Sequence, residues 1–344
     1  MTTGTEFRRL IFIRTDRLGE TLLNLPAVAA LHAALPQAAV TLLAHPDLQS
    51  LLAGLPGVEQ VLACPQGPRG LWWMRALQLG CRLRRERFDL AIVSNPKKEL
   101  HAAVWLAGIP VRIGYDRKWG GLLTHRVPDR KALGEQHEVE YNLNLLRAIG
   151  LSITAPQWRL PCGATERLEV RRLLEQQGIQ PSEPFLTVHP WTSNPSKQWP
   201  IDRYQALLQR SAGQLAVKVV VIGGPEERRR IAQVLPAGAA AVDLVGRLTL
   251  RQLAALLERA ALLISNDSGP VHLAAAVGTP TVVLFGTLEA ATGPRRWGPW
   301  GEGHRIILKP SMEEITVEEV VAAVRQQLHE RASPHPDREP VRDR

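Results

Sequence analysis

Residues 262–287 constrain the fold more than any other stretch of this chain. They read Leu-Leu-Ile-Ser-Asn-Asp-Ser-Gly-Pro-Val-His-Leu-Ala-Ala-Ala-Val-Gly-Thr-Pro-Thr-Val-Val-Leu-Phe-Gly-Thr. The pattern predicts a short buried strand, a polar turn, a helix and a second buried strand. Pro270 suits the first helical turn, where a missing N–H costs nothing. Residues 281–285 are apolar and β-branched, as central parallel strands are. Such a unit predicts an α/β fold.

The polar turn carries the first candidate site. Asp267, Ser268, Gly269 and His272 stand at the start of the predicted helix. Unpaired backbone N–H groups and the positive end of the helix dipole favour an anion there. Asp and Ser are also common capping residues, so a plain helix cap is the alternative interpretation.

The domain organisation follows from length and from the alternation of strands and helices. A chain of 344 residues fits two domains of ordinary size. The alternation is interrupted by the Pro- and Gly-containing stretch 150–165 and then restarts. We predict two doubly wound domains, residues 1–155 and 156–331, facing each other across a cleft. The charged, Pro-rich tail 332–344 is predicted to be disordered.

Composition narrows the function classes. No run of residues approaches the ~20 apolar positions needed to cross a bilayer, and the N-terminus lacks a basic segment followed by an apolar one. Three scattered cysteines suit a reducing compartment and show no metal-ligand spacing. We therefore expect a cytoplasmic protein without a metal or a cofactor.

The positive charge is unevenly distributed. Residues 1–160 hold 20 Lys and Arg against 13 Asp and Glu, so most of the net charge of +9 lies in the first half. This balance favours an anionic partner. No nucleic-acid partner is expected, because the basic residues are not interleaved with aromatic residues in a binding pattern. The arginine-rich helix predicted at 71–87, with Trp72 and Trp73, could touch an anionic membrane. Alternatively it is an ordinary surface helix with its aromatic side chains in the core.

Polar residues follow several predicted strands of the second half. Ligands of open α/β sheets bind beyond the carboxyl ends of the strands. Residues 190–200 follow one strand and offer hydroxyls and Lys197, which suit a diphosphate. Glu226 and Glu227 follow another, where an acid could bind a ribose or complement a helix dipole. Neither half has the Gly-x-Gly-x-x-Gly of a Rossmann dehydrogenase.

Together these segments resemble glycosyltransferase family 9, the ADP-heptose:lipopolysaccharide heptosyltransferases of GT-B fold. The resemblance rests on residues 10–28, 189–200, 223–226 and 266–276. It implies an inverting transfer of a heptose-like sugar from an ADP-sugar donor. The implied acceptor is the lipopolysaccharide core or a related lipid-linked, acidic molecule. The implied location is the cytoplasm, with a peripheral contact at the inner face of the cytoplasmic membrane as a further option.

The resemblance also assigns roles to residues. Lys197, with Thr192 or Ser196, would meet the donor diphosphate, and the turn that begins at Asp267 would bind the pyrophosphate. No Asp-x-Asp motif is present, so metal bridging of the diphosphate is not required. The ribose would be bound by Glu226 or by its neighbour Glu227. The full donor-binding set is Thr192, Ser196, Lys197, Glu226, Asp267, Ser268, Gly269 and His272.

The first half would supply the catalytic base and the acceptor site. Glu20 falls where the family commonly has an Asp regarded as the general base, and Asp16 is the alternative. Glu20 could instead only cap the following helix. The acceptor-binding candidates, each of which could also be a solvated surface residue, are Arg14, Arg17, Lys97, Lys98 and Arg117.

Two other function classes fit the same architecture. One is a sugar-nucleotide epimerase, which would need catalytic acids facing the donor sugar and no acceptor site. The other is a non-catalytic sugar-nucleotide-binding protein, which the change from Asp to Glu at Glu20 would explain if it abolished turnover.

Overall fold

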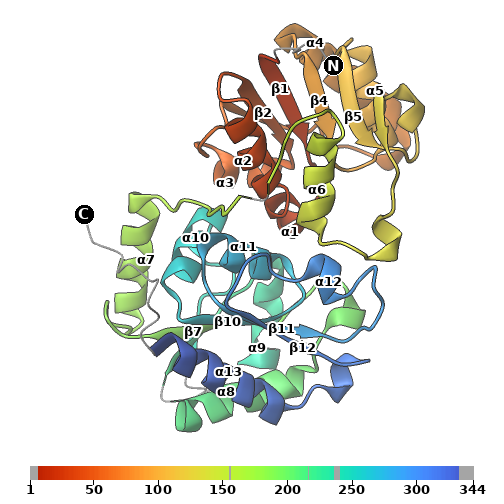
Figure 1. Cartoon of the computed structure of the whole chain (residues 1–344). Coiled ribbons are helices and arrows are strands. Elements are labelled where there is room, and N and C mark those ends of the chain that lie inside the picture. The colour runs from red at the N-terminus through yellow and green to blue at the C-terminus, as the bar shows by residue number, and fades with distance from the viewer. Residues whose placement is uncertain (1–6, 155, 216, 236–240, 333–344) are drawn as a thin grey trace. The chain divides into compact units, whose positions relative to one another are not determined.

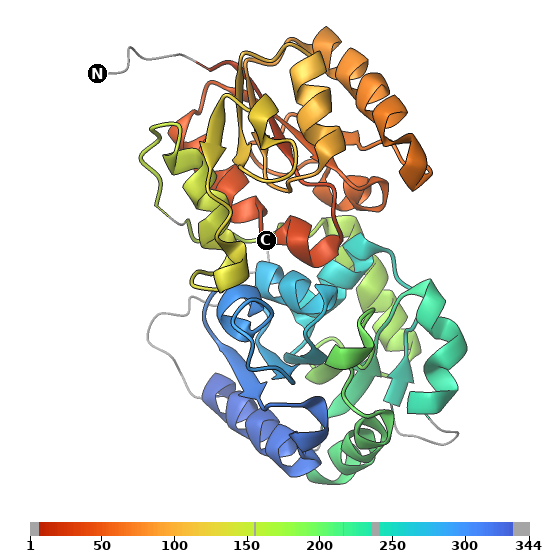
Figure 2. The same cartoon turned by 90° about the vertical axis from the view of Figure 1, so that its right-hand side faces the viewer.

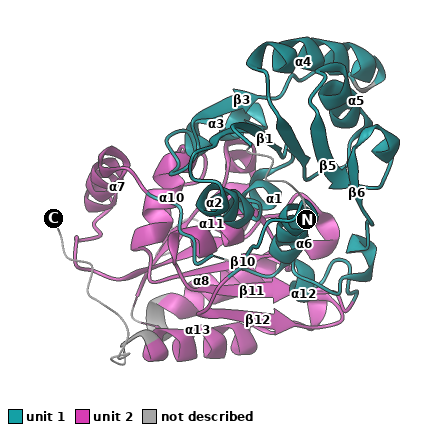
Figure 3. Cartoon of the chain, turned by 45° about the horizontal axis from the view of Figure 1, so that its top comes forward, with its two compact units in different colours: residues 1–161, 289–300 teal, residues 162–288, 301–344 magenta. Residues whose placement is uncertain are grey.

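The computed structural model describes residues 7–154, 156–215, 217–235 and 241–332 (Figure 1). The chain forms two compact units, which Figure 3 shows in different colours. Unit 1 comprises residues 1–161 and 289–300, and unit 2 comprises residues 162–288 and 301–344. In the described residues no helix is long and apolar enough to cross a membrane.

Unit 1 is built on a six-stranded parallel sheet with the order β3-β2-β1-β4-β5-β6. Helices α4 and α5 pack side by side on one face of this sheet, and α2 and α6 lie on the other (Figure 2). The strands are β1 (Arg9–Ile13), β2 (Ala39–Ala44), β3 (Gln60–Ala63), β4 (Leu90–Val93), β5 (Val111–Tyr115) and β6 (His125–Val127). The helices are α1 (Leu18–Leu22), α2 (Leu25–Ala34), α3 (Gln49–Leu52), α4 (Trp72–Glu86), α5 (Lys98–Leu106), α6 (Glu138–Arg147) and α12 (Pro294–Trp297).

Unit 2 contains a second six-stranded parallel sheet, with the order β12-β11-β10-β7-β8-β9. Its central strands are buried along their whole length, as covered parallel strands must be. The strands are β7 (Phe185–His189), β8 (Lys218–Val221), β9 (Ala241–Asp243), β10 (Leu262–Asn266), β11 (Thr281–Phe285) and β12 (His304–Leu308). The helices are α7 (Ala164–Gln176), α8 (Ile201–Gln214), α9 (Ile231–Val234), α10 (Leu250–Arg259), α11 (Gly269–Val277) and α13 (Val317–Ala332).

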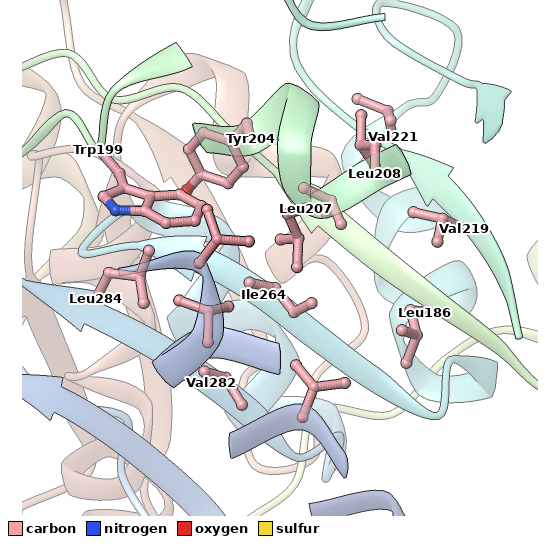
Figure 4. Close-up of a cluster of buried hydrophobic side chains, with 14 of the residues drawn as sticks. Leu186, Trp199, Tyr204, Leu207, Leu208, Val219, Val221, Ile264, Val282 and Leu284 are labelled. Atoms are coloured by element: carbon pink, nitrogen blue, oxygen red, sulfur yellow. The ribbon is translucent and has the colours of Figure 1, made fainter. Parts of the chain in front are cut away.

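The core of unit 2 fixes the loop that follows β7. Figure 4 shows Trp199 and Tyr204 within a cluster of aliphatic side chains from the sheet and α8. Their rings meet edge to face with centroids 4.7 Å apart, and both side chains are fully buried. Because Trp199 ends the loop, its burial holds residues 190–198 against the end of the sheet.

The prediction of two doubly wound α/β domains is confirmed, while their boundaries differ from those predicted. Unit 1 extends to residue 161, whereas the predicted domain ends at 155, and Leu160 in this added stretch is buried. Residues 289–300, predicted for the second domain, belong to unit 1, where Arg296 pairs with Glu138. Ala332 ends α13, and the rest of the predicted disordered tail lies outside the described residues.

Candidate functional site

In unit 2 the carboxyl ends of β7 and β10 lie side by side. The two strands are hydrogen-bonded neighbours, with His189 opposite Ser265. The loop after β7 is tied to the end of β10, because the Trp199 backbone N–H donates to Asn266 Oδ1 at 3.0 Å. The Trp199 indole donates in turn to the Ile315 carbonyl at 2.9 Å. These contacts bring two segments far apart in sequence to one edge of the sheet.

The most prominent contact at this edge is the ion pair between Lys197 and Asp267. Asp267 is buried and Lys197 is partly exposed. The pair lies beside the start of α11, a helix of nine residues whose positive dipole end adds to the charge of Lys197. The structure therefore brings together the predicted loop cation and the predicted anion-binding turn.

Ser268 occupies the N-cap position of α11, but its side chain makes no capping hydrogen bond. Its hydroxyl lies 3.2 Å from His189 Nδ1 and 2.9 Å from the Ser265 hydroxyl. The plain helix-cap interpretation therefore does not hold for Ser268. Burial lowers the pKa of His189 to about 4, so the ring is neutral at neutral pH. His272 lies in α11 and is buried.

The two acidic residues after β8 have different environments. The Glu227 carboxylate accepts a hydrogen bond from the backbone N–H of Gly224, the N-cap residue of the following turn. Glu226, its neighbour in the 3-10 turn Pro225–Arg230, is exposed. Gly223 is required just before this turn, because a Cβ there would lie 2.8 Å from the Trp191 ring. This arrangement favours Glu226 as the acid that is available to a ligand.

The two hydroxyls predicted to help Lys197 both contact Asn194 in the loop after β7. Thr192 Oγ1 accepts from the Asn194 backbone N–H at 3.3 Å, and the Ser196 hydroxyl donates to Asn194 Oδ1 at 3.0 Å. Ser196 is exposed and Thr192 partly exposed. The loop thus presents them as a group next to Lys197 in sequence.

In unit 1 the ends of β1 and β4 meet in the same way, and Asp16 is held there by cations. Its Oδ1 lies 2.7 Å from Lys97 Nζ, and its Oδ2 lies 3.1 Å from Arg14 Nε. Asn95 Nδ2 donates to Oδ1 at 3.1 Å. Burial alone would raise the pKa of Asp16, but Arg14 and Lys97 outweigh it and hold the pKa below its usual value. Both carboxylate oxygens are already engaged, which makes Asp16 a weak base.

Glu20 differs from Asp16 in its contacts. It lies in the first turn of α1 and is partly buried. Its backbone carbonyl accepts from Asn24 Nδ2 at 2.6 Å. Among the described residues its carboxylate makes no hydrogen bond or ion pair, and it does not cap α1, whose N-cap is Arg17. Unlike that of Asp16, the carboxylate of Glu20 is therefore available to contact a ligand.

A buried ion cluster behind Asp16 is absent from the sequence-based prediction. Glu138, fully buried at the start of α6, lies 2.6 Å from Lys131 Nζ, 3.4 Å from Arg14 Nη1 and 3.0 Å from Arg296 Nη2. Burial would raise the pKa of Glu138, but the three cations outweigh the effect of burial and lower the pKa. The available signal was an acid on the buried face of an amphipathic helix.

The predicted acceptor-binding residues fall into two groups. Arg14 and Lys97 contact Asp16, and Arg14 is buried, which indicates that it positions its neighbours. The other three are exposed. Arg17 precedes α1, Lys98 lies 4.3 Å from the centroid of the Trp72 ring, and Arg117 lies 3.5 Å from Asp129.

The geometry of both units can now be compared with known proteins. Two Rossmann-like units, each built on a six-stranded parallel sheet, are the architecture of GT-B glycosyltransferases. This chain belongs to glycosyltransferase family 9 (heptosyltransferase), whose family model matches residues 76–323.

Individual relatives agree with this assignment. Lipopolysaccharide heptosyltransferase 3 of Escherichia coli K12 is 26% identical over 302 residues, covering 83% of both chains. A glycosyl transferase of family 9 from Veillonella parvula superposes with a TM-score of 0.85 at 20% identity, covering 94% of this chain and 98% of that one. The E. coli ADP-heptose lps heptosyltransferase II gives a TM-score of 0.77 at 24% identity, with 95% and 100% covered.

Proposed function

We propose that this glycosyltransferase moves a heptose-like sugar from an ADP-sugar donor to the lipopolysaccharide core or a related lipid-linked, acidic acceptor. The transfer inverts the anomeric centre and needs no metal ion. The observation that carries the proposal is the Lys197–Asp267 pair beside the start of α11. The names of the E. coli relatives, which refer to lipopolysaccharide and ADP-heptose, support the choice of acceptor and donor.

Unit 2 has the groups that a departing nucleoside diphosphate requires. Lys197 and the N-terminal N–H groups of α11 offer positive charge, which stabilises the negative charge that develops on the diphosphate. Thr192 and Ser196 offer hydroxyls from the same loop. Glu226 is the acid available to the ribose, because Glu227 is engaged with Gly224. Glu226 therefore completes the donor site.

Unit 1 would supply the base. Glu20 takes the proton of the acceptor hydroxyl as its oxygen forms a bond to the anomeric carbon. The bond from that carbon to the diphosphate breaks at the same time, and the nucleoside diphosphate leaves with the electron pair. Because the oxygen enters opposite the leaving group, the configuration inverts. Lys97, Lys98, Arg17 and Arg117 would meet acidic groups of the acceptor, while Arg14 positions Asp16. An acceptor with a lipid anchor also requires a peripheral membrane contact.

The direct test is release of ADP by the purified full-length protein. We expect release from ADP-heptose only when a deacylated core acceptor is present, and calorimetry should show tighter binding of ADP than of UDP or GDP. Consumption of a UDP-sugar without any acceptor would indicate an epimerase. Binding of ADP without turnover would indicate a non-catalytic protein. Retention of the donor's anomeric configuration in the product, or loss of activity with a chelator, would overturn the mechanistic details.

The choice of base has its own prediction. Glu20→Gln should lower kcat by about 10²–10⁴, because a positioned general base contributes that much. Asp16→Asn should keep a larger share of kcat, because the Asp16 carboxylate is already engaged by cations. Exposed Glu59→Gln is the matched control. Steady-state kinetics with the deacylated acceptor decide the matter, and full activity of Glu20→Gln with loss in Asp16→Asn would reverse the assignment.

A further inference from the structure

Helix α4 in unit 1 exposes large apolar side chains on its first two turns. Trp73, Met74 and Leu77 are 54%, 49% and 51% exposed, and they lie on one stripe of the helix, three and four residues apart. The alternative prediction, an ordinary surface helix with both tryptophans in the core, is therefore wrong for Trp73. The buried face of α4 is formed instead by Ala76, Leu79, Gly80 and Leu83.

The exposed apolar area continues onto neighbouring segments of unit 1. Trp119, which is 47% exposed, meets the half-buried Trp72 edge to face with ring centroids 4.9 Å apart. Helix α5 lies beside α4 (Figures 1 and 2), and Trp105 on it is 52% exposed. We call these residues the aromatic surface, and it consists of Trp73, Met74, Leu77, Trp105 and Trp119. Clustered apolar exposure of this kind marks an interaction site.

Exposed cations flank the aromatic surface. Arg82, Arg84 and Arg85 lie on the last turns of α4, whose only acid, Glu86, pairs with Arg9 at 3.2 Å. At the other side, Lys118 precedes Trp119 and is exposed. Apolar and aromatic side chains bordered by Lys and Arg match an anionic bilayer, where the rings enter the headgroup region and the cations meet lipid phosphates.

We propose that the aromatic surface of unit 1 docks on an anionic lipid bilayer as a peripheral contact. The proposal rests on the proposed function only for the lipid-linked nature of the acceptor, and the docking itself is testable without any substrate. It names the part of the chain that meets the membrane: the outer side of α4 and α5, together with the segment around Trp119.

The test measures binding of the full-length protein to sedimented vesicles. Wild type should bind vesicles that contain phosphatidylglycerol and phosphatidylcholine, bind pure phosphatidylcholine at least tenfold less, and release as salt rises. The triple variant Trp73→Ser, Met74→Ser, Leu77→Ser should lower the partition coefficient at least tenfold. Arg84→Glu with Arg85→Glu should lower it by a similar factor. The control Leu168→Ser removes an exposed leucine from α7 in unit 2 and should have no effect.

Activity on the deacylated, water-soluble acceptor separates this proposal from the proposed function. The triple variant should keep wild-type turnover, which also shows that it is folded. Vesicle binding without any transfer would leave the docking surface in place and overturn the proposed function. If the wild-type protein transfers the sugar but does not bind anionic vesicles, the proposed docking surface is wrong and the proposed function stands. A triple variant that binds vesicles as well as wild type does would also overturn the docking surface. So would a triple variant whose only change is weaker association between copies of the protein.

Discussion

The two sheets have the same topology but exchange the charges at their strand ends. Counted within each unit, both follow the order 3-2-1-4-5-6, so the first and fourth strands are neighbours. In unit 1 the acid, Asp16, follows the first strand and Lys97 follows the fourth. In unit 2 Lys197 follows the first strand and the acid, Asp267, follows the fourth. One ion pair thus recurs with its partners reversed.

The difference agrees with the two ligands of the proposed function. In unit 2 the helix after the fourth strand, α11, starts next to an acid that is paired with Lys197. In the proposed function this helix start binds the donor diphosphate. In unit 1 the corresponding helix, α5, starts with Lys98 and has Lys97 as its N-cap, a placement that the helix dipole disfavours. Cations in that position are explained by an acidic ligand, as proposed for the acceptor.

Among the changes that test this comparison of the two units, the largest effect is expected from breaking the ion pair of unit 2. Lys197→Ala should lower kcat by about 10²–10³, because it removes a charge that stabilises the leaving diphosphate. Lys218→Ala, which removes the Lys of an exposed pair with Glu183 at 2.9 Å, serves as control. Steady-state ADP release measures both variants. Equal activities would show that the pair of unit 2 has only a structural role.

The second prediction concerns the residue at the end of the first strand in unit 2, the neutral His189. In unit 1 the cation Arg14 follows the first strand. Burial lowers the pKa of His189 from 6.5 to about 4. The pKa of His189 is lower in the folded protein than in the unfolded chain. The neutral ring therefore makes its full contribution to the free energy of unfolding above about pH 6.5. This contribution is lost as the pH falls through about 4, by about 3 kcal/mol in total.

The variant His189→Asn keeps a neutral polar group and should show a shallower loss of unfolding free energy over that pH interval. Denaturant titrations at several pH values measure the slope, and His45→Asn, at a partly exposed histidine, serves as the control. An unchanged slope in His189→Asn would mean that another group accounts for the acid sensitivity.

A smaller effect is expected from breaking the ion pair of unit 1. Lys97→Ala should raise the KM for the acceptor about tenfold, consistent with the loss of one charged hydrogen bond, and leave ADP affinity unchanged. Arg9 lies at the amino end of β1, away from the strand end that Lys97 follows. Arg9→Ala should therefore change neither the KM for the acceptor nor the affinity for ADP. Kinetics with varied acceptor, together with ADP calorimetry, distinguish the two units. A weaker affinity for ADP in Lys97→Ala would contradict the division of roles.

The smallest effect separates two neighbouring acids in unit 2. Glu226→Ala should weaken ADP binding about fivefold, because one hydrogen bond to the ribose is lost. Glu227→Ala should leave ADP affinity closer to wild type and lower stability instead, because it removes the capping contact with Gly224. Calorimetry and thermal unfolding measure the two effects. The reverse pattern would assign the ribose to Glu227.

The sequence predicts the buried strands of the sheets, and the proximity of Lys197 to Asp267, for physical reasons. Strands such as β10 and β11 are apolar throughout, so their position inside a parallel sheet is readable. The rule that ligands bind beyond strand ends then groups Lys197 with Asp267. The sequence does not predict the edge strands β6 and β12, because both are exposed or partly exposed along their length and contain His and Arg. β6 also has only three residues. The sequence also left Glu226 and Glu227 equivalent, since only the Gly224 contact distinguishes them.

The buried cluster around Glu138 was not predictable because its members come from four separate segments. Arg14, Lys131 and Arg296 carry no shared pattern, and only the folded chain brings them around one carboxylate. The same contact explains why residues 289–300 lie in unit 1, although the sequence places them in the second half. A salt bridge between segments 158 residues apart leaves no local signal.

The placement of α12 has a consequence for how the chain is made. Residues 289–300 complete unit 1, and His137 Nε2 lies 2.9 Å from the Gly298 carbonyl while Arg296 meets Glu138. A ribosome must therefore synthesise most of unit 2 before unit 1 receives its last segment. A fragment that stops at residue 161 would leave the Glu138 carboxylate with two cations instead of three. Neither unit of this enzyme is formed by one continuous segment of the chain.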